Sequence, residues 1–201
     1  RERVVTIGNP VLTPELLDRI QEPLEHPWFG SGCPPVILGV GRLAVQKDFS
    51  TLIRAFAHLR TQRSVRLLIL GEGRCRQELE GLVSSLGLQD DVSLPGFVEN
   101  PLSYMKHASV FALSSIYEGF GNVVVEALAA RCPVVSTRCP GGPAEILDEG
   151  RYGALVPTGN PEALSDALGE ALGQSPDRER LRARAEDYTP ASIAQRYAAL
   201  I

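Results

Sequence analysis

The sequence predicts an α/β fold in which helices cover both faces of a doubly wound parallel sheet. Six short runs of apolar or β-branched residues recur along the chain, and segments with helical periodicity separate them. The runs show no polar alternation, which is typical of strands that are buried on both faces. Strands of this kind that alternate with helices form a parallel sheet. We therefore expect one Rossmann-like domain.

The expected strands are bounded by Gly, Pro, Ser or Asp and occupy residues 36–40, 66–70, 92–94, 110–113, 134–137 and 154–156. The expected helices occupy residues 50–61, 75–86, 102–108, 122–130, 143–148, 160–172, 178–188 and 189–201. In the first of these helices Leu52, Ile53 and Phe56 share one apolar stripe, which predicts a core position.

The segment before the first expected strand is irregular. Residues 3–7 are compatible with a short strand, Thr13 and Pro14 predict a helix start, and four prolines and two glycines interrupt residues 22–35. Trp28 and Phe29 are expected to fasten this crossing segment to the domain. We assign residues 1–24 to a linker and crossing segment, 25–188 to the domain, and 189–201 to a terminal helix.

Composition limits the classes of function. The chain has 201 residues, 44% hydrophobic and 22% charged, which suits one globular domain, and its net charge of -4 offers no general field for nucleic acid or an anionic membrane. Four cysteines form no metal-ligand spacing and predict reduced thiols and a cytoplasmic location. No apolar run approaches the roughly 18 to 20 residues that span a bilayer. The chain begins without Met, as expected of part of a longer protein.

The most informative stretch is residues 114–130, SSIYEGFGNVVVEALAA, which follows an expected buried strand. An acidic, glycine-rich turn that opens a helix aims free backbone N–H groups and a positive helix end outward, an arrangement that receives an anion. Glu126 follows Glu118 after seven intervening residues, about one turn inside the helix. The pattern predicts a site that holds a phosphate beside hydroxyl groups.

The end of the first strand predicts a second phosphate-binding element. Gly39 and Gly41 permit close approach of a pyrophosphate, and Arg42 and Lys47 flank the loop that follows. Ala44 occupies the place of the third glycine of a dinucleotide fingerprint, so an oxidoreductase is disfavoured. A solvated loop with two surface bases is the simpler alternative.

The two glutamates also have simpler alternatives. Acidic residues near a helix N-terminus stabilise the helix dipole, and Glu126 could occupy a solvated helix position. However, Val123, Val125 and Leu128 surround Glu126 in sequence, so its carboxylate needs hydrogen-bond donors, which ribose hydroxyls would supply.

Three ordered blocks resemble the retaining GT-B glycosyltransferases of the family 4 type, the glycosyl transferases group 1. They are residues 36–49 (VILGVGRLAVQKDF), residues 114–130, and residues 133–146 (PVVSTRCPGGPAEI). The similarity runs from about residue 8 to residue 201 and covers only the C-terminal, donor-binding half of such an enzyme. The segment Asn9–Pro10–Val11 is similar to the hinge between the two halves of these enzymes.

The resemblance implies a role for each candidate residue. Gly41, Arg42 and Lys47 would hold the donor diphosphate, Glu126 the nucleotide ribose and Glu118 the donor sugar. The catalytic residues would be Arg42, Lys47 and Glu118. The backbone around the glycine turn would lie along sugar and phosphates, and the loop after the third strand would receive the base; these residues are Gly119, Phe120, Gly121, Phe97 and Val98. No DxD pair is present, so neither a metal nor a cofactor is implied.

The implied function is transfer of a hexose or N-acetylhexosamine from a nucleoside diphosphate sugar, with UDP favoured, to a hydroxyl acceptor in polysaccharide, lipopolysaccharide or glycolipid synthesis. No residue is an evident nucleophile, and the resemblance implies front-face attack with retention. The resemblance also implies that a sugar or lipid-linked acceptor binds mainly to an absent N-terminal domain, and that this half alone is inactive. Peripheral membrane association of the whole enzyme stays open.

A GT-B sugar nucleotide epimerase and a non-catalytic sugar nucleotide-binding module are the alternatives. A terminal helix of this kind crosses to the first half or packs on its own domain.

Overall fold

The computed structural model describes residues 6–200 and contains a six-stranded parallel sheet with the strand order β3-β2-β1-β4-β5-β6. The strands are β1 (Val36–Val40), β2 (Arg66–Leu70), β3 (Val92–Gly96), β4 (Val110–Leu113), β5 (Val134–Thr137) and β6 (Ala154–Val156). All five neighbouring pairs are parallel. The predicted α/β fold with a doubly wound parallel sheet is confirmed, and all six predicted strands are present.

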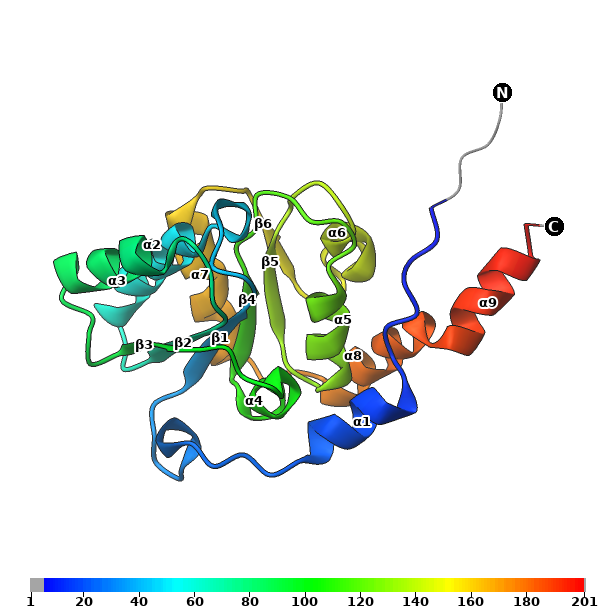
Figure 1. Cartoon of the computed structure of the whole chain (residues 1–201), viewed down its shortest axis with the longest axis horizontal. Helices are drawn as coiled ribbons and strands as arrows, with labels where there is room; N and C mark the ends of the chain where they lie inside the picture. The colour runs from blue at the N-terminus through cyan, green and yellow to red at the C-terminus, as the bar shows by residue number, and fades with distance from the viewer. Residues whose placement is uncertain (1–5, 201) are drawn as a thin grey trace.

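Helices cover both faces of the sheet (Figure 1). One face packs against α2 (Phe49–Arg60), α3 (Arg76–Ser85) and α7 (Pro161–Gly173). The other face packs against α4 (Pro101–His107), α5 (Asn122–Ala129), α6 (Pro143–Ile146) and α8 (Arg178–Ala185), with α1 (Pro14–Gln21) and α9 (Pro190–Ala198) outside them. Short 3-10 turns lie at η1 (Pro27–Phe29), η2 (Val45–Lys47), η3 (Asp148–Gly150) and η4 (Glu186–Tyr188).

Alternation of side chains along each strand divides the core between the two faces. Ile37, Leu67 and Ile69 face the α2 side, whereas Leu38 and Leu68 face the α5 side, and each of these side chains is fully buried. The strands show no polar alternation because helices cover both faces of the sheet.

Helix starts follow the sequence signals more closely than helix ends. The Thr13 hydroxyl accepts from the backbone N–H of Leu16, so the predicted N-cap of α1 is confirmed. The helix predicted over 143–148 ends early, at Ile146, because Asp148 and Glu149 adopt left-handed backbone angles with φ of 48° and 53°. The helix predicted over 178–188 likewise ends at Ala185 and continues as the 3-10 turn η4.

The two ends of the described chain pack on the domain and on each other. Gly8 is buried, and a Cβ atom there would lie 2.6 Å from Cζ of Phe120. The Leu12 N–H donates to the carbonyl of Tyr188 at 3.0 Å, and Ile193 of α9 is in the core. The predicted strand at 3–7 lies mostly outside the described residues, and residues 6 and 7 are not in a strand. The assigned boundaries at residues 24 and 188 stay a prediction.

Candidate functional site

The candidate site lies at the carboxyl edge of the sheet, between β1 and β4. The strand order reverses there, and parallel α/β sheets bind ligands in the crevice that opens at such a switch point. Two neighbouring cavities occupy this edge, with volumes of about 420 and 400 Å³, and Val40 and Gly41 line both. The two cavities therefore adjoin at the end of β1, and we call them together the crevice.

The first cavity brings the predicted charged residues together. Its walls come from the hinge-like segment, the end of β1 with its loop, and the mouth of α5; they are Asn9, Val40, Gly41, Lys47, Glu118, Phe120, Gly121, Asn122, Val123 and Glu126. Lys47 and both glutamates are therefore neighbours, although the sequence separates Lys47 from Glu118 by 71 positions. We call this space the carboxylate cavity.

Lys47 and Glu118 form a buried ion pair. The Lys47 Nζ lies 2.6 Å from Oε1 of Glu118, and the two side chains are only 16% and 9% exposed. The Ser115 hydroxyl donates to the same carboxylate oxygen at 2.6 Å. The Lys47 side chain runs across Gly41, where a Cβ atom would lie 2.9 Å from its Cε atom. Gly41 thus leaves space for the lysine that the sequence assigned to phosphate.

The glycine turn at the mouth of α5 is backed by the loop before α6. Gly121 caps α5 with φ of 87°, a left-handed value that favours glycine, and no side chain caps the helix. Cβ atoms at Gly141 and Gly142 would lie 2.2 Å and 2.0 Å from the carbonyl oxygens of Glu118 and Phe120. Gly141 and Gly142, in the third of the sequence blocks, are therefore required for packing against the turn.

Glu126 faces the carboxylate cavity from inside α5. Burial raises the pKa of its carboxyl group, and the positive charges of Arg19 and Lys47 partly oppose this rise. A partly buried carboxylate of this kind gains from donors that a ligand brings, such as hydroxyl groups.

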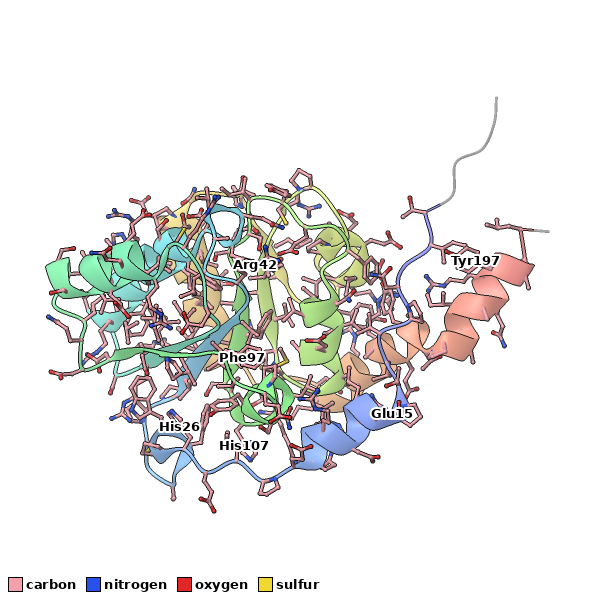
Figure 2. All side chains as sticks on the ribbon, in the orientation of Figure 1. Glu15, His26, Arg42, Phe97, His107 and Tyr197 are labelled. Carbon is pink, nitrogen blue, oxygen red and sulfur yellow. The ribbon has the colours of Figure 1, made fainter. Side chains whose placement is uncertain are left out.

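The second cavity is more apolar and holds Arg42, Phe97 and Val98. Its other walls are Val40, Gly41, Leu70, Gly71, Glu72, Glu99 and Pro101. The Phe97 ring is 78% exposed, and Figure 2 shows Phe97 and Arg42 in the same part of the molecule. An exposed ring in an apolar cavity is suited to stack on a planar base. The sequence grouped Arg42 with Lys47, but the structure places Arg42 beside Phe97, outside the carboxylate cavity.

Two contacts with the linker were missed by the sequence. The Asn9 amide donates to Oδ1 of Asn122 at 2.9 Å, and the Arg19 guanidinium donates to the carbonyl of Glu99 in the Phe97 loop. The sequence singles out Asn9 only as part of its hinge-like segment and does not single out Arg19. Neither contact is marked in the sequence, because each residue meets its partner only through the crossing of the linker over the folded domain.

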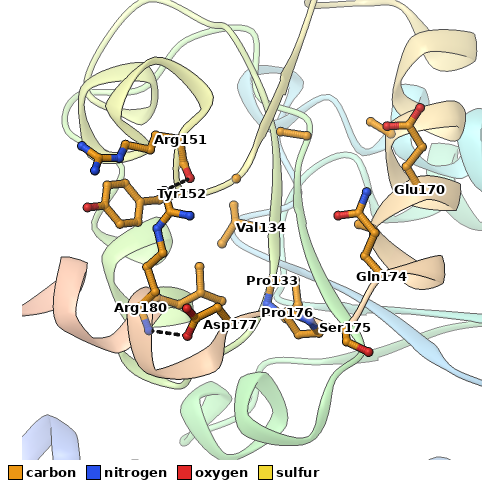
Figure 3. Close-up of a pocket in the computed structure, with 15 residues that line it drawn as sticks. Pro133, Val134, Arg151, Tyr152, Glu170, Gln174, Ser175, Pro176, Asp177 and Arg180 are labelled. Atoms are coloured by element: carbon orange, nitrogen blue, oxygen red, sulfur yellow. Dashed lines mark hydrogen bonds between the residues drawn. The ribbon is translucent and has the colours of Figure 1, made fainter.

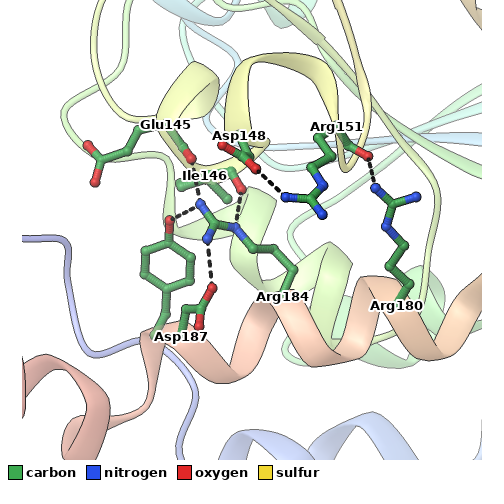
Figure 4. Close-up of polar contacts among 8 residues, drawn as sticks. Glu145, Ile146, Asp148, Arg151, Arg180, Arg184 and Asp187 are labelled. Atoms are coloured by element: carbon green, nitrogen blue, oxygen red, sulfur yellow. Dashed lines mark hydrogen bonds and ion pairs between the residues drawn. The ribbon is translucent and has the colours of Figure 1, made fainter.

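A charged network on the α5 side fastens α6 to the C-terminal segment (Figure 4). Arg184 donates to the carbonyls of Ile146 at 2.9 Å and Glu145 at 2.7 Å, to Asp187 at 2.6 Å, and to the Tyr188 hydroxyl at 3.2 Å. Tyr188 is fully buried, and its ring meets the ring of Phe120 edge-on at 5.6 Å. Arg184 thus links the two elements that back the glycine turn.

A third hollow, of about 260 Å³, lies at the opposite edge of the sheet, where β5 and β6 begin (Figure 3). Arg180 donates to the carbonyl of Arg151 at 3.2 Å and stacks on Tyr152 at 5.0 Å. These contacts join α8 to the start of β6, so we interpret this hollow as a packing feature.

Within residues 6–200, no three His, Cys, Asp or Glu side chains are grouped as metal ligands. In the same range, every helix is too short or too polar to cross a membrane.

The chain resembles bacterial glycosyltransferases in sequence. It is 37% identical over 163 residues to an N-acetylgalactosaminyltransferase of Campylobacter jejuni that acts on a diphospho-undecaprenol-linked sugar, covering 79% of this chain and 44% of the relative. It is 34% identical over 153 residues to the lipopolysaccharide core biosynthesis glycosyltransferase LpsE of Rhizobium meliloti, covering 76% and 44%. The chain therefore spans less than half the length of these relatives.

Solved structures agree on the fold. TarM from S. aureus, determined as a variant with Fondaparinux, α-GlcNAc-glycerol and UDP, matches with a TM-score of 0.78 and 20% identity over 90% of this chain and 37% of its own. HepE from Anabaena, determined with UDP and glucose, matches with a TM-score of 0.76 and 23% identity over 96% and 55%.

The family description that matches is Glycosyl transferases group 1, over residues 29–188. These residues include the candidate site apart from its two linker contacts, and the resemblance carried by the three sequence blocks is confirmed. The chain belongs to the glycosyl transferases group 1 family, and its fold is that of the C-terminal half of a GT-B enzyme.

Proposed function

We propose that this chain binds the UDP-sugar donor of a retaining glycosyltransferase that transfers a hexose or N-acetylhexosamine to a hydroxyl acceptor. The observation that carries the proposal is the carboxylate cavity, where Lys47, Glu118 and Glu126 meet at the mouth of α5. Two structural neighbours support UDP as the nucleotide, since TarM and HepE were both determined with it.

The geometry suggests how the donor lies along the crevice. The base stacks on Phe97 in the second, apolar cavity, which we call the base cavity. The ribose hydroxyls donate to Glu126. The diphosphate lies between Gly41 and the N-terminus of α5, where Lys47 and the free N–H groups stabilise its charge. Arg42, beside the base cavity, reaches the same diphosphate from the other side. The sugar then faces Glu118.

These groups would stabilise the leaving diphosphate as its bond to the sugar breaks. In the proposed reaction the acceptor oxygen attacks from the face that the diphosphate leaves, and the acceptor proton passes to a phosphate oxygen. The configuration at the sugar carbon is therefore retained. Lys47 and Arg42 act as electrostatic catalysts in this step, and Glu118 orients the sugar.

We place the complete enzyme in the cytoplasm, in polysaccharide, lipopolysaccharide or glycolipid synthesis. All four cysteines are free thiols, which agrees with a reducing compartment. The C. jejuni relative acts on a lipid-linked sugar and LpsE on the lipopolysaccharide core. Acceptors of this kind would bring the complete enzyme to a membrane surface.

Calorimetry with UDP, GDP, ADP and NAD tests the assignment of the nucleotide. We expect the nucleoside diphosphates to bind more tightly than NAD, because the crevice offers sites for one base, one ribose and one diphosphate. Among them we expect UDP to bind most tightly, since TarM and HepE were determined with it. Tighter binding of NAD than of every nucleoside diphosphate would contradict the proposal.

Two charge-neutral variants test the roles of the glutamates. Glu126→Gln should weaken UDP and the UDP-sugar equally, because both contain the ribose. Glu118→Gln should not weaken UDP but should weaken the UDP-sugar by about 1 to 3 kcal/mol, the range for a lost hydrogen bond to a charged group. The control is Glu145→Gln, an exposed acid on α6 outside the cavity. Equal weakening of both ligands by both variants would show that the two roles are not divided in this way.

A further inference from the structure

A fourth hollow borders the candidate donor site, and of the residues in its walls only Arg42 is assigned to the donor above. It measures about 550 Å³ and is formed by the loop after β1, the loop after β2 and the loop after β4, with Arg42, Val45, Gln46, Arg74, Ile116 and Tyr117 in its walls. Arg42 also lines the base cavity, and Tyr117 directly precedes Glu118. The hollow therefore lies beside the place assigned to the donor sugar.

The hollow gathers two guanidinium groups that have no charged partner among residues 6–200. Among the arginines of residues 6–200, all but three contact a carboxylate, a backbone carbonyl or an aromatic ring. The three are Arg42, Arg54 and Arg74, and two of them line this hollow. Guanidinium groups that line a hollow and have no partner in the described part of the chain are suited to bind phosphate oxygens.

The hollow also gathers exposed apolar side chains. Seven large apolar residues are exposed in the described part of the chain, and three of them are in this hollow: Val45 at 60%, Ile116 at 42% and Tyr117 at 54%. Exposed apolar side chains that cluster in a concave surface indicate a binding site. An occupant thus needs an apolar part next to its negative charge.

Hydrogen bonds between two of the loops hold the hollow in shape. The Ile116 N–H donates to the carbonyl of Gln46 at 2.8 Å, and the Gln46 amide donates to the carbonyl of Tyr117 at 2.9 Å. The Ser114 hydroxyl donates to the carbonyl of Lys47 at 2.7 Å. The apolar residues on the two loops therefore keep a fixed spacing before any ligand arrives.

We propose that this hollow binds the phosphate or diphosphate group of a lipid-linked acceptor, together with the first part of its apolar chain. This inference rests on the proposed transferase function, because an acceptor must approach the donor sugar beside Glu118. Arg74 donates to the acceptor phosphate, Arg42 remains with the donor diphosphate, and Val45, Ile116 and Tyr117 cover the chain. The donor does not fill the hollow, since its base and its diphosphate already have their own cavities.

Titration with geranyl diphosphate tests this site directly. The chain is first saturated with UDP so that the donor site is closed to the probe, and binding is measured by calorimetry. We expect geranyl diphosphate to bind, and to bind more tightly than inorganic pyrophosphate, because only the former reaches the apolar side chains. Arg74→Ala should weaken geranyl diphosphate about tenfold, as expected for one lost charge-assisted hydrogen bond.

Arg54→Ala is the matched control, because Arg54 is also exposed and without a partner in the described chain but lies on α2 outside the hollow. It should leave geranyl diphosphate binding unchanged, whereas Tyr117→Ser should weaken it. Circular dichroism melting curves confirm that the variants are folded.

The site is overturned if geranyl diphosphate fails to bind, if UDP displaces it, or if Arg74→Ala and Arg54→Ala weaken it equally. Equal affinity for pyrophosphate would overturn the role of the apolar chain. If UDP itself does not bind, the proposed donor function fails, and the same variants titrated without UDP still decide whether the hollow binds the probe.

Discussion

At the scale of single residues, Glu126 is suited to binding and unfavourable for stability. Its burial raises the pKa of its carboxyl group, so the folded protein binds that proton more tightly than the unfolded chain does. The stabilising contribution is then fully present below the unfolded-state pKa of about 4.3 and is lost as the pH rises through the higher folded-state pKa. The charged form that would accept from ribose is therefore the form that destabilises the empty protein.

Glu126→Gln should consequently raise the melting temperature of the unliganded protein near pH 7, with the gain shrinking towards pH 4, where the wild-type carboxyl group is also neutral. Glu118→Gln should have the opposite sign, because it removes the partner of buried Lys47. Thermal melts of both variants over this pH range provide the measurement. A lower melting temperature for Glu126→Gln at neutral pH would indicate that its charge has a structural role.

A comparison of UDP with uridine distinguishes the diphosphate contacts of Lys47 and Arg42 from recognition of the base. Lys47→Ala and Arg42→Ala should each weaken UDP by about 1.5 to 3 kcal/mol, the range for a hydrogen bond between charged groups, and should leave uridine nearly unaffected. Lys106→Ala is the control, since Lys106 bonds Gln21 outside the crevice. Calorimetry with both ligands gives the answer, and equal losses for UDP and uridine would refute the phosphate assignment.

At the scale of elements, the mouth of α5 depends on α6 and α8, which contribute no side chain to either cavity of the crevice. Arg184 satisfies the last carbonyls of α6 and also bonds Tyr188, whose ring packs on Phe120. Because one side chain connects both supports of the glycine turn, its loss should loosen them together.

Arg184→Ala should lower the free energy of unfolding by about 2 to 4 kcal/mol, since it removes hydrogen bonds to two carbonyl groups, to Asp187 and to the hydroxyl of buried Tyr188 at once. Arg180→Ala, on the same helix and with the same change of charge, removes one bond to the Arg151 carbonyl and the exposed stacking on Tyr152, and should cost only about 1 kcal/mol. Urea denaturation compares the two variants. Similar losses for both would mean that Arg184 has no special supporting role.

The elements also show which features the sequence can predict. Apolar runs and helical periodicity depend on burial alone, so all six strands and their intervening helices were predicted. The end of α6 could not be predicted, because Asp148 and Glu149 adopt left-handed backbone angles that their residue types permit but do not require. The ion pair between Lys47 and Glu118 was missed although both residues were singled out, since a pair 71 positions apart depends on strand order.

At the scale of the whole molecule, the sheet topology explains why one crevice collects the candidate residues. The loops after β1 and β4 leave the sheet as neighbours at the switch point, and the loops after β2 and β3 continue the same edge. The carboxylate cavity, the base cavity and the hollow beside Tyr117 therefore lie along one side of the domain. Once the strand order is known, their adjacency follows without further assumptions.

This arrangement predicts that the chain alone binds the donor but does not transfer the sugar. Every group that we assign to the donor lies within it, whereas it spans only 44% of the C. jejuni relative and of LpsE. Transfer requires an acceptor hydroxyl held against the donor sugar, and correct positioning of two reactants accounts for about 7 to 11 kcal/mol of a barrier. We therefore expect UDP to bind in calorimetry while labelled UDP-sugar yields no transfer product with added acceptor, in parallel with an active two-domain relative as positive control. Transfer at a rate matching that relative would show that this half alone also positions the acceptor hydroxyl against the donor sugar, and absence of UDP binding would contradict the proposed donor site.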